Sequence, residues 1–134
     1  MSILTDIVSG KRPAIKVYET VKFLAIMAQA PNAIGHVICF PKQETHDLFA
    51  LDNDIYHDFF AFIQVVALGL KEVVPCRKIG MASIGLAVEH VHVHLVPANQ
   101  AMDMNFMDSK VSVTEEIKQR LAKQIAQKIV QSKS

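Results

Sequence analysis

The chain has 134 residues, of which 51% are hydrophobic and 20% are charged, with a formal net charge of +1. This length and apolar content suit a single globular domain over residues 1–134 with a core of its own. The near-neutral charge and the lack of a basic cluster argue against nucleic-acid binding, which needs several convergent Lys or Arg side chains. We expect a small-molecule partner, no membrane contact and a cytoplasmic location, because no segment approaches 18 uninterrupted apolar residues and no leader pattern is visible.

The first third of the chain predicts a short helix followed by strands. An amphipathic stretch over residues 2–9 is closed by Gly10, a residue that favours the end of a helix. Extended sequence follows at residues 15–18, and apolar runs of strand length occupy residues 23–27 and 37–40, separated by a turn-rich PNAIG segment. We therefore expect a three-stranded antiparallel meander.

Two later segments carry the periodicity of helices. From the N-cap candidate Asp52, apolar residues recur at helical spacing until Pro75 forbids continuation, which predicts a long core helix over residues 53–74. Ser112 and Glu115 have the spacing of a capping box, and an apolar stripe follows them. This second pattern predicts a C-terminal amphipathic helix. Its stripe consists of Val113, Ile117, Leu121, Ile125 and Ile129.

The two cysteines give no sign of a disulfide or metal framework. Cys39 and Cys76 stand alone in the sequence, without a C-x-x-C pair. We predict that both are buried free thiols.

Between the two long helices we expect a second hairpin, formed by residues 78–84 and 91–96 and joined near Gly85. Its second strand belongs to the segment EHVHVHLVP, the strongest functional signal in the chain. Valine and leucine alternate there with three histidines, whose side chains would share one face of a strand at a spacing of about 6.6 Å. Packing alone rarely requires such a row of imidazoles, which could surround a phosphate or a metal ion. The three are His90, His92 and His94.

The other histidines are interpreted from their surroundings. His57 falls on the polar face of the long helix and His46 in the polar loop QETHD, so we expect both at the surface. His36 follows Gly35 and opens an apolar strand, where a ring needs a hydrogen-bond partner. A role in the site and a role as a structural anchor explain His36 equally well.

Several blocks of the sequence together resemble the histidine triad (HIT) superfamily. Its signature alternates histidine with apolar residues, as HVHVHLV does at residues 90–96. GKRPAIKVYE at residues 10–19 and PNAIGHVICFPK at residues 31–42 resemble two further blocks of the family. PCRKIGMA at residues 75–82 resembles a bacterial subgroup of HIT proteins. The resemblance covers roughly residues 2–100.

The resemblance implies an α+β fold of the HIT type, with a five-stranded antiparallel sheet, one long core helix and a C-terminal amphipathic helix, usually as a homodimer. It implies a nucleotide hydrolase or transferase that acts at the α-phosphorus of a nucleoside phosphoramidate or a dinucleoside polyphosphate. The middle histidine, His92, would be the nucleophile and form a transient nucleotidyl-imidazole, with His90 and His94 as supports. A neutral imidazole is both a competent nucleophile near neutral pH and a good leaving group. This chemistry requires no cofactor and no metal.

Other positions of the family's binding site differ in this sequence. Many members place Gly-Gln-Ser/Thr-Val before the triad, where this chain has GLAV, so Leu86 and Ala87 replace two phosphate contacts. Ala28 stands where a ribose-binding acid is expected, and a hydrogen bond to such a charged group is worth about 1.5 to 3 kcal/mol. By analogy, Ile26 and Ile38 would line the base subsite. The remaining candidates for substrate binding are His36 and Gln29.

Two alternatives to an active hydrolase or transferase stay open. A nucleotide-binding module with lost or weak turnover is compatible with Ala28, Leu86 and Ala87. A metal site is the other, since three histidines could supply three nitrogen ligands, but alternate positions of a straight strand would spread them over about 13 Å. Some family members hold a structural zinc through an amino-terminal cysteine, and residues 3–7 contain none.

Overall fold

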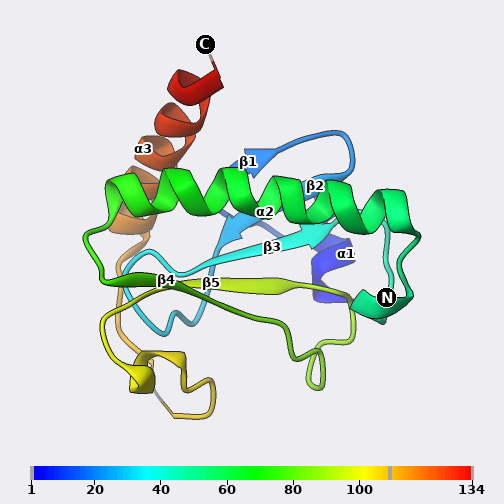
Figure 1. Cartoon of the computed structure of the whole chain (residues 1–134). Coiled ribbons are helices and arrows are strands. Elements are labelled where there is room, and N and C mark those ends of the chain that lie inside the picture. Colours follow the sequence, from blue (N-terminus) through cyan, green and yellow to red (C-terminus); the bar gives the residue numbers. More distant parts are fainter. Residues whose placement is uncertain (1, 109, 134) are drawn as a thin grey trace.

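A computed structural model of the chain describes residues 2–108 and 110–133. A short helix and three strands lead into a long helix, and two further strands precede a C-terminal helix (Figure 1). This arrangement is the predicted α+β fold. The elements are α1 Ile3–Val8, β1 Lys16–Glu19, β2 Phe23–Met27, β3 Val37–Pro41, η1 Leu48–Ala50, α2 Asn53–Val73, β4 Lys78–Ala82, β5 Val93–Ala98, η2 Ala101–Met104 and α3 Glu115–Lys133, where η denotes a 3-10 helix.

The five strands form one antiparallel sheet in the order β1-β2-β3-β5-β4. The predicted meander and the predicted second hairpin are both confirmed. They meet where β3 pairs with β5, with Ile38 opposite His94 and Cys39 opposite Val93. Cys39 is buried, as predicted. The strand that ends the histidine segment therefore has a hydrogen-bonded neighbour on each side, which makes it a rigid support.

The two faces of the sheet are covered by different helices. One face, which includes Phe23 and Val37, packs against α2 and α3 in the main core. The other face, which includes Leu24 and Phe40, packs against the short helix α1. Since side chains alternate along a strand, His94 shares the α1 face with its partner Ile38. The triad thus lies on the side of the sheet opposite α2.

Helix α2 begins directly after Asp52, as predicted, although the described side chain of Asp52 makes no capping hydrogen bond. The helix ends at Val73, two residues before Pro75. Gly69 lets α3 pack closely against it, because a Cβ at this position would lie 2.8 Å from Cγ1 of Ile129. Within the part of the chain that the structure describes, no helix is both long and apolar enough to cross a membrane.

Two local predictions were wrong. The capping box at Ser112 and Glu115 does not form, because α3 starts only at Glu115 and the hydroxyl of Thr114 accepts the capping hydrogen bond at 3.2 Å. The amphipathic helix itself is confirmed, with Ile125 in its buried face. Cys76 is only half-buried, since it lies in the short connection between α2 and β4 and not in the core.

Candidate active site

The histidine segment is extended, but only its last histidine lies within a strand. β5 begins at Val93, two residues later than predicted. The reason is that the N–H of Val91 donates to the carbonyl of Thr45 at 2.7 Å and not to a neighbouring strand. Val91 and Val93 nevertheless point into the core, as predicted. His90 and His92 therefore lie just before β5.

The backbone holds the ring of His92 in one orientation. Its Nδ1 lies 2.7 Å from the carbonyl oxygen of His90. A carbonyl can only accept a hydrogen bond, so Nδ1 carries the proton. A neutral ring in this tautomer has its lone pair on Nε2. The carbonyl of His92 in turn accepts a hydrogen bond from the hydroxyl of Ser83 at 2.9 Å.

His36 and His94 form a hydrogen-bonded pair with a definite direction. The backbone N–H of Asn32 donates to Nδ1 of His36 at 2.9 Å, so a neutral His36 carries its proton on Nε2. This Nε2 lies 3.0 Å from Nδ1 of His94 and donates to it. A neutral His94 must then carry its own proton on Nε2. His36 therefore contacts the triad through His94 and is anchored in the protein through Asn32.

Burial keeps this pair neutral at pH 7. His36 is 1% exposed. Burial lowers its pKa to about 3, with smaller effects of His94 and Lys110. The pKa of His94 is lowered to about 4, mainly by burial and to a smaller extent by the charges of His92 and Lys110. The proton positions derived above therefore hold across the physiological range.

A segment between β5 and α3 closes one side of the pair. The ring centroid of Phe106 lies 4.6 Å from that of His94 and 6.0 Å from that of His36. Nζ of Lys110 lies 5.9 Å from the centroid of Phe106 and 2.8 Å from Oδ1 of Asn32. Sequence analysis missed these residues, because the segment has neither helical nor strand periodicity.

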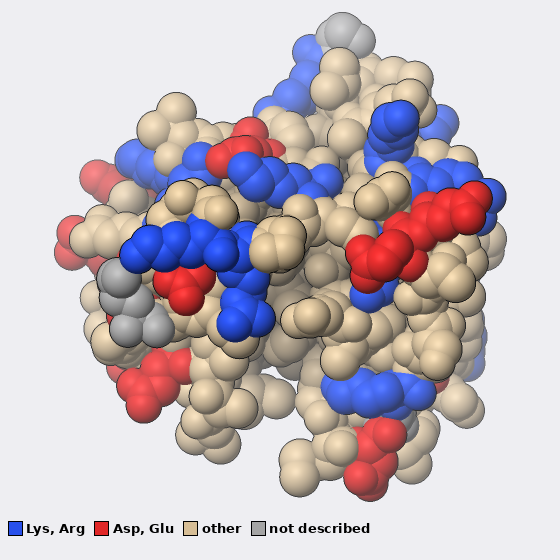
Figure 2. Space-filling model, turned by 180° about the vertical axis from the view of Figure 1, so that it is seen from behind, with Lys and Arg blue, Asp and Glu red and all other residues tan. Residues whose placement is uncertain are grey.

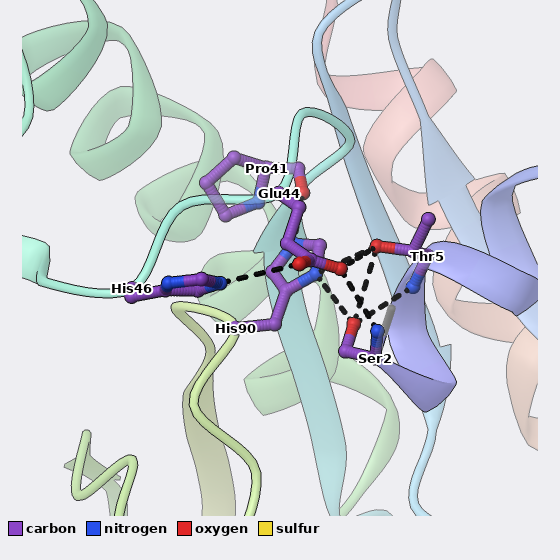
Figure 3. Close-up of polar contacts among 6 residues, drawn as sticks. All are labelled: Ser2, Thr5, Pro41, Glu44, His46 and His90. Atoms are coloured by element: carbon purple, nitrogen blue, oxygen red, sulfur yellow. Dashed lines mark hydrogen bonds and ion pairs between the residues drawn. The ribbon is translucent and has the colours of Figure 1, made fainter.

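His90 differs from the other two members of the triad in that both of its ring nitrogens are engaged with the protein. Nε2 lies 2.7 Å from the carbonyl oxygen of Pro41, and Nδ1 lies 2.9 Å from Oγ of Ser2 (Figure 3). The ring is fully buried and meets Phe40 edge-on, with 5.6 Å between centroids. His90 is thus packed between β3 and α1, whereas His92 and His94 each have one ring nitrogen without a described partner.

Two predicted residues of the base subsite lie together beside the triad. Ile26 pairs directly with Ile38 across β2 and β3, and Ile38 pairs with His94 across β3 and β5. Ala28 follows on the same face as Ile26 and is 2% exposed. Its N–H donates to the carbonyl of His36 at 2.9 Å. The structure therefore brings these four positions and His36 close to one another.

The other predicted substrate-binding residues lie further out. Gln29 is exposed, and its carbonyl accepts a hydrogen bond from Nζ of Lys118 at 3.1 Å. Leu86 and Ala87 lie in the loop that precedes the triad, and Leu86 is 87% exposed. His57 is exposed on α2, as predicted.

The residues around His90 do not fit a structural zinc. Zinc in such sites favours thiolates and imidazoles, whereas α1 and its cap offer the hydroxyls of Ser2 and Thr5. Among residues 2–108 and 110–133, no three His, Cys, Asp or Glu side chains are grouped so that they could hold a metal ion.

The face of the molecule seen in Figure 2 is electrically mixed. Figure 2 shows the molecule from behind, where acidic and basic side chains are interspersed around a hollow lined by uncharged residues. A separate cavity of about 710 Å³ is lined by residues 21–23, 41–43, 45–47, 50–52 and 55. Its described lining includes none of His36, His90, His92 and His94. This cavity is therefore distinct from the histidine cluster.

Comparison with known proteins identifies the class of protein that this fold and this histidine cluster define. Residues 9–101 match the HIT domain, and the chain belongs to the HIT domain family. An uncharacterised HIT-like protein of Mycobacterium tuberculosis is 30% identical over 100 residues, which cover 71% of this chain and 69% of that protein. An adenosine 5′-monophosphoramidase of Schizosaccharomyces pombe is 29% identical over 97 residues, with coverage of 71% and 72%.

Solved structures confirm the fold. A hypothetical histidine triad nucleotide-binding protein of Sulfolobus tokodaii superposes with a TM-score of 0.83 at 25% identity, over 97% of this chain and 93% of that chain. A zinc-bound histidine triad family protein of Mycobacterium smegmatis gives a TM-score of 0.81 at 25% identity, over 98% and 95%. The predicted HIT-type fold is thereby confirmed over almost the whole chain.

Proposed function

We propose that the protein is a nucleotide hydrolase or transferase that acts at the α-phosphorus of a nucleoside phosphoramidate or a dinucleoside polyphosphate. The observation that carries the proposal is that the adjacent rings of His92 and His94 hold their protons on different nitrogens. Their centroids lie 5.0 Å apart. A neutral His92 offers an Nε2 lone pair, and a neutral His94 offers an Nε2–H donor. The phosphoramidase relative of S. pombe supports phosphoramidates as the substrate class.

In the first half of the proposed reaction, the Nε2 lone pair of His92 attacks the α-phosphorus. The bond from phosphorus to the leaving group breaks, and the leaving group takes the electron pair. A leaving phosphate departs as the anion, whereas a leaving amine also takes a proton from solvent, which the proton released in the second half replaces. As the His92 ring gains positive charge, its Nδ1–H bond to the carbonyl of His90 strengthens. The Nε2–H of His94 donates to a phosphoryl oxygen or to the leaving atom, where negative charge develops.

In the second half, water or another nucleotide acceptor attacks the same phosphorus. The bond between phosphorus and Nε2 of His92 breaks, and the ring recovers its electron pair. With water, the products are a nucleoside monophosphate and one proton. The paired side chains of Ile26 and Ile38 support an apolar contact with the base. Such a contact selects a base by its shape and offers few hydrogen bonds for distinguishing one base from another.

A binding module with weak turnover is the second candidate. The exposure of Leu86 and the apolar side chain at Ala28 favour it, because both positions lack polar groups for the substrate. The two candidates share the same site and differ in whether the covalent step occurs. Measurement of turnover therefore separates them.

The test is hydrolysis of adenosine 5′-phosphoramidate by the unmodified protein and by His92→Ala, with the exposed His57→Gln as the control. We expect His92→Ala to lose activity by about 10³-fold or more, since the nucleophile of a covalent mechanism is removed. His92→Gly should regain part of the activity when imidazole is added. Full activity in His92→Ala would contradict the mechanism, and binding without turnover in the unmodified protein would favour the binding module.

A further inference from the structure

A hydrogen-bonded network joins α1 and the loop after β3 to the first histidine of the triad (Figure 3). Oγ1 of Thr5 donates to Oε1 of Glu44 at 2.5 Å, and the backbone N–H of Ser2 donates to the same oxygen at 2.8 Å. Oγ of Ser2 lies 2.9 Å from Nδ1 of His90. The network thus leads from a carboxylate through hydroxyl groups to the ring of His90.

The directions of these hydrogen bonds follow from the groups that can act only as a donor or only as an acceptor. The carbonyl of Pro41 can only accept, so Nε2 of His90 carries the proton. In a neutral ring, Nδ1 then accepts, and the hydroxyl of Ser2 is its donor. Oγ of Ser2 accepts from the N–H of Thr5 at 3.0 Å. Oγ of Ser2 also lies 3.2 Å from Oγ1 of Thr5, whose own proton goes to Glu44, so the single hydroxyl proton of Ser2 is shared between Thr5 and the closer Nδ1 of His90. The acceptor at the far end of the network is Glu44.

The carboxylate of Glu44 is fully ionised at neutral pH. Hydrogen bonds from Thr5, from the backbone of Ser2 and from His46 lower its pKa to about 2. The pKa of His90 is lowered, mainly because the ring is buried. The hydrogen bond to Pro41 and the charge of Glu44 act in the opposite direction, whereas the charges of His92 and His46 lower the pKa further. The ring is therefore neutral at pH 7 and needs a donor at Nδ1.

His90 matters for the site because its carbonyl oxygen is the group that holds Nδ1 of His92 at 2.7 Å. The ring of His90 is pinned at one nitrogen by Pro41 and at the other by Ser2. A rotation of residue 90 would break both bonds and displace the carbonyl. The groups that fix the His90 ring therefore also fix the orientation of His92.

We propose that Glu44, acting through the hydroxyls of Ser2 and Thr5, is a positioning residue for the triad. Together with the carbonyl of Pro41, which accepts from Nε2, it keeps His90 in the tautomer protonated at Nε2 and thereby holds the carbonyl that orients His92. The catalytic consequence rests on the proposed function, in which His92 is the nucleophile. A purely structural role, in which Ser2 caps α1 and Glu44 only ties down that helix, would change stability and leave the tautomer of His90 as it is.

The test compares Glu44→Ala with Glu44→Gln, whose amide oxygen can accept the same two hydrogen bonds without the charge. His46→Gln is the matched control, because His46 is the exposed partner of Glu44, at 3.2 Å from Oε2. Thr5→Val removes only the hydroxyl of Thr5, and it replaces Glu44→Ala as the test variant if Glu44→Ala does not fold. Nitrogen-15 NMR of the imidazoles reports the tautomer of His90, and phosphoramidate turnover gives kcat and KM.

We expect one tautomer of His90 in the unmodified protein and two in Glu44→Ala, with kcat lowered about tenfold and KM nearly unchanged. Glu44→Gln should keep the tautomer and most of kcat, and should lower the pKa of His90 because the opposite charge is gone. His46→Gln should leave the tautomer and kcat as they are.

A single tautomer of His90 in folded Glu44→Ala and in Thr5→Val would overturn the inference. If the unmodified protein turns over no nucleotide, the proposed function fails, and the tautomer still decides the positioning role. A shift to two tautomers would then support that role, and an unchanged tautomer would refute it.

Discussion

Nε2 of His36 donates to Nδ1 of His94 across 3.0 Å, and this bond determines which nitrogen of His94 can serve a substrate as a donor. The direction of the bond is set by a backbone group, because the N–H of Asn32 occupies Nδ1 of His36. A buried ring that receives a backbone N–H on one side has a single neutral tautomer open to it. The state of His94 is therefore imposed by main-chain geometry on the opposite side of His36.

Replacement of His36 should damage catalysis more than binding. His36→Ala leaves Nδ1 of His94 without its donor, so His94 can take the wrong tautomer and lose the Nε2–H. We expect kcat for adenosine 5′-phosphoramidate to fall about 10-fold to 100-fold, equivalent to about 1.4 to 2.7 kcal/mol. His57→Ala, on the exposed face of α2, should keep full activity. An unchanged kcat in His36→Ala would show that the pair has no part in turnover.

Stability should fall as the pH drops below the ordinary histidine range. The folded pKa values of His36 and His94 are about 3 and about 4, whereas both rings titrate near 6.5 when unfolded. The unfolded chain therefore binds more protons between these limits, and the free energy of unfolding decreases as pH falls. Between pH 7 and pH 5 the loss is about 2 kcal/mol for each ring. Urea unfolding across this range measures it, and a flat profile would contradict buried neutral rings.

Gly35, the residue before His36, should tolerate no side chain. Its φ is +91°, and a Cβ there would lie 2.8 Å from Cγ2 of Val74. Gly10 is a matched control, because its φ is +85° but nothing lies within 4 Å of a Cβ. Gly10→Ala should cost about 1 kcal/mol from backbone strain, and Gly35→Ala about 2 kcal/mol more from the clash. Equal losses in urea unfolding would mean that packing at Gly35 is unimportant.

The pocket should discriminate weakly between ribose and deoxyribose. Alanine at position 28 offers no carboxylate to the sugar hydroxyls. We expect kcat/KM for adenosine and deoxyadenosine phosphoramidates to differ by less than about tenfold, or about 1.4 kcal/mol. Ala28→Asp should widen this ratio by improving the ribose substrate alone. A hundredfold preference in the unmodified protein would point to another residue for the diol contact, with Gln29 and Asn32 as the candidates.

The chain should form a two-fold dimer through the free edge of its sheet. β4 is an outermost strand, and an uncovered strand edge invites pairing with a second copy. Met81 on this strand and Leu68 on α2 are 54% and 60% exposed. Light scattering should give twice the single-chain mass of 14.9 kDa, and Leu68→Glu should shift the protein toward the monomer. A monomer mass at micromolar concentration would contradict this prediction.

The fold was predictable because its elements have strong periodicity. The apolar spacing of α2, the alternation around the triad and the glycine after α1 each reflect a local physical preference, and all three are borne out. The start of β5 was not predictable, because it depends on a hydrogen bond between Val91 and Thr45, which lie far apart in the sequence. Alternation alone cannot show where a strand loses its neighbour.

The site was only partly predictable for a related reason. Four histidines could be singled out by their residue type and their setting. Phe106 could not, since an aromatic residue in an irregular segment carries no sign of what it will cover. Ser2 was interpreted as part of a helix, and Glu44 was grouped with a polar surface loop, so their contact with His90 was missed. Both interpretations describe local surroundings, whereas their role arises from tertiary contacts.

The acceptor that holds the ring of His92 is a main-chain carbonyl, which has a consequence for mutagenesis. Every substitution at position 90 retains that oxygen, so an alanine scan removes the ring that holds the carbonyl in place and never the acceptor itself. A loss of activity in His90→Ala would therefore measure displacement of the backbone. A replacement that restores the contacts with Pro41 and Ser2 should restore the orientation of His92.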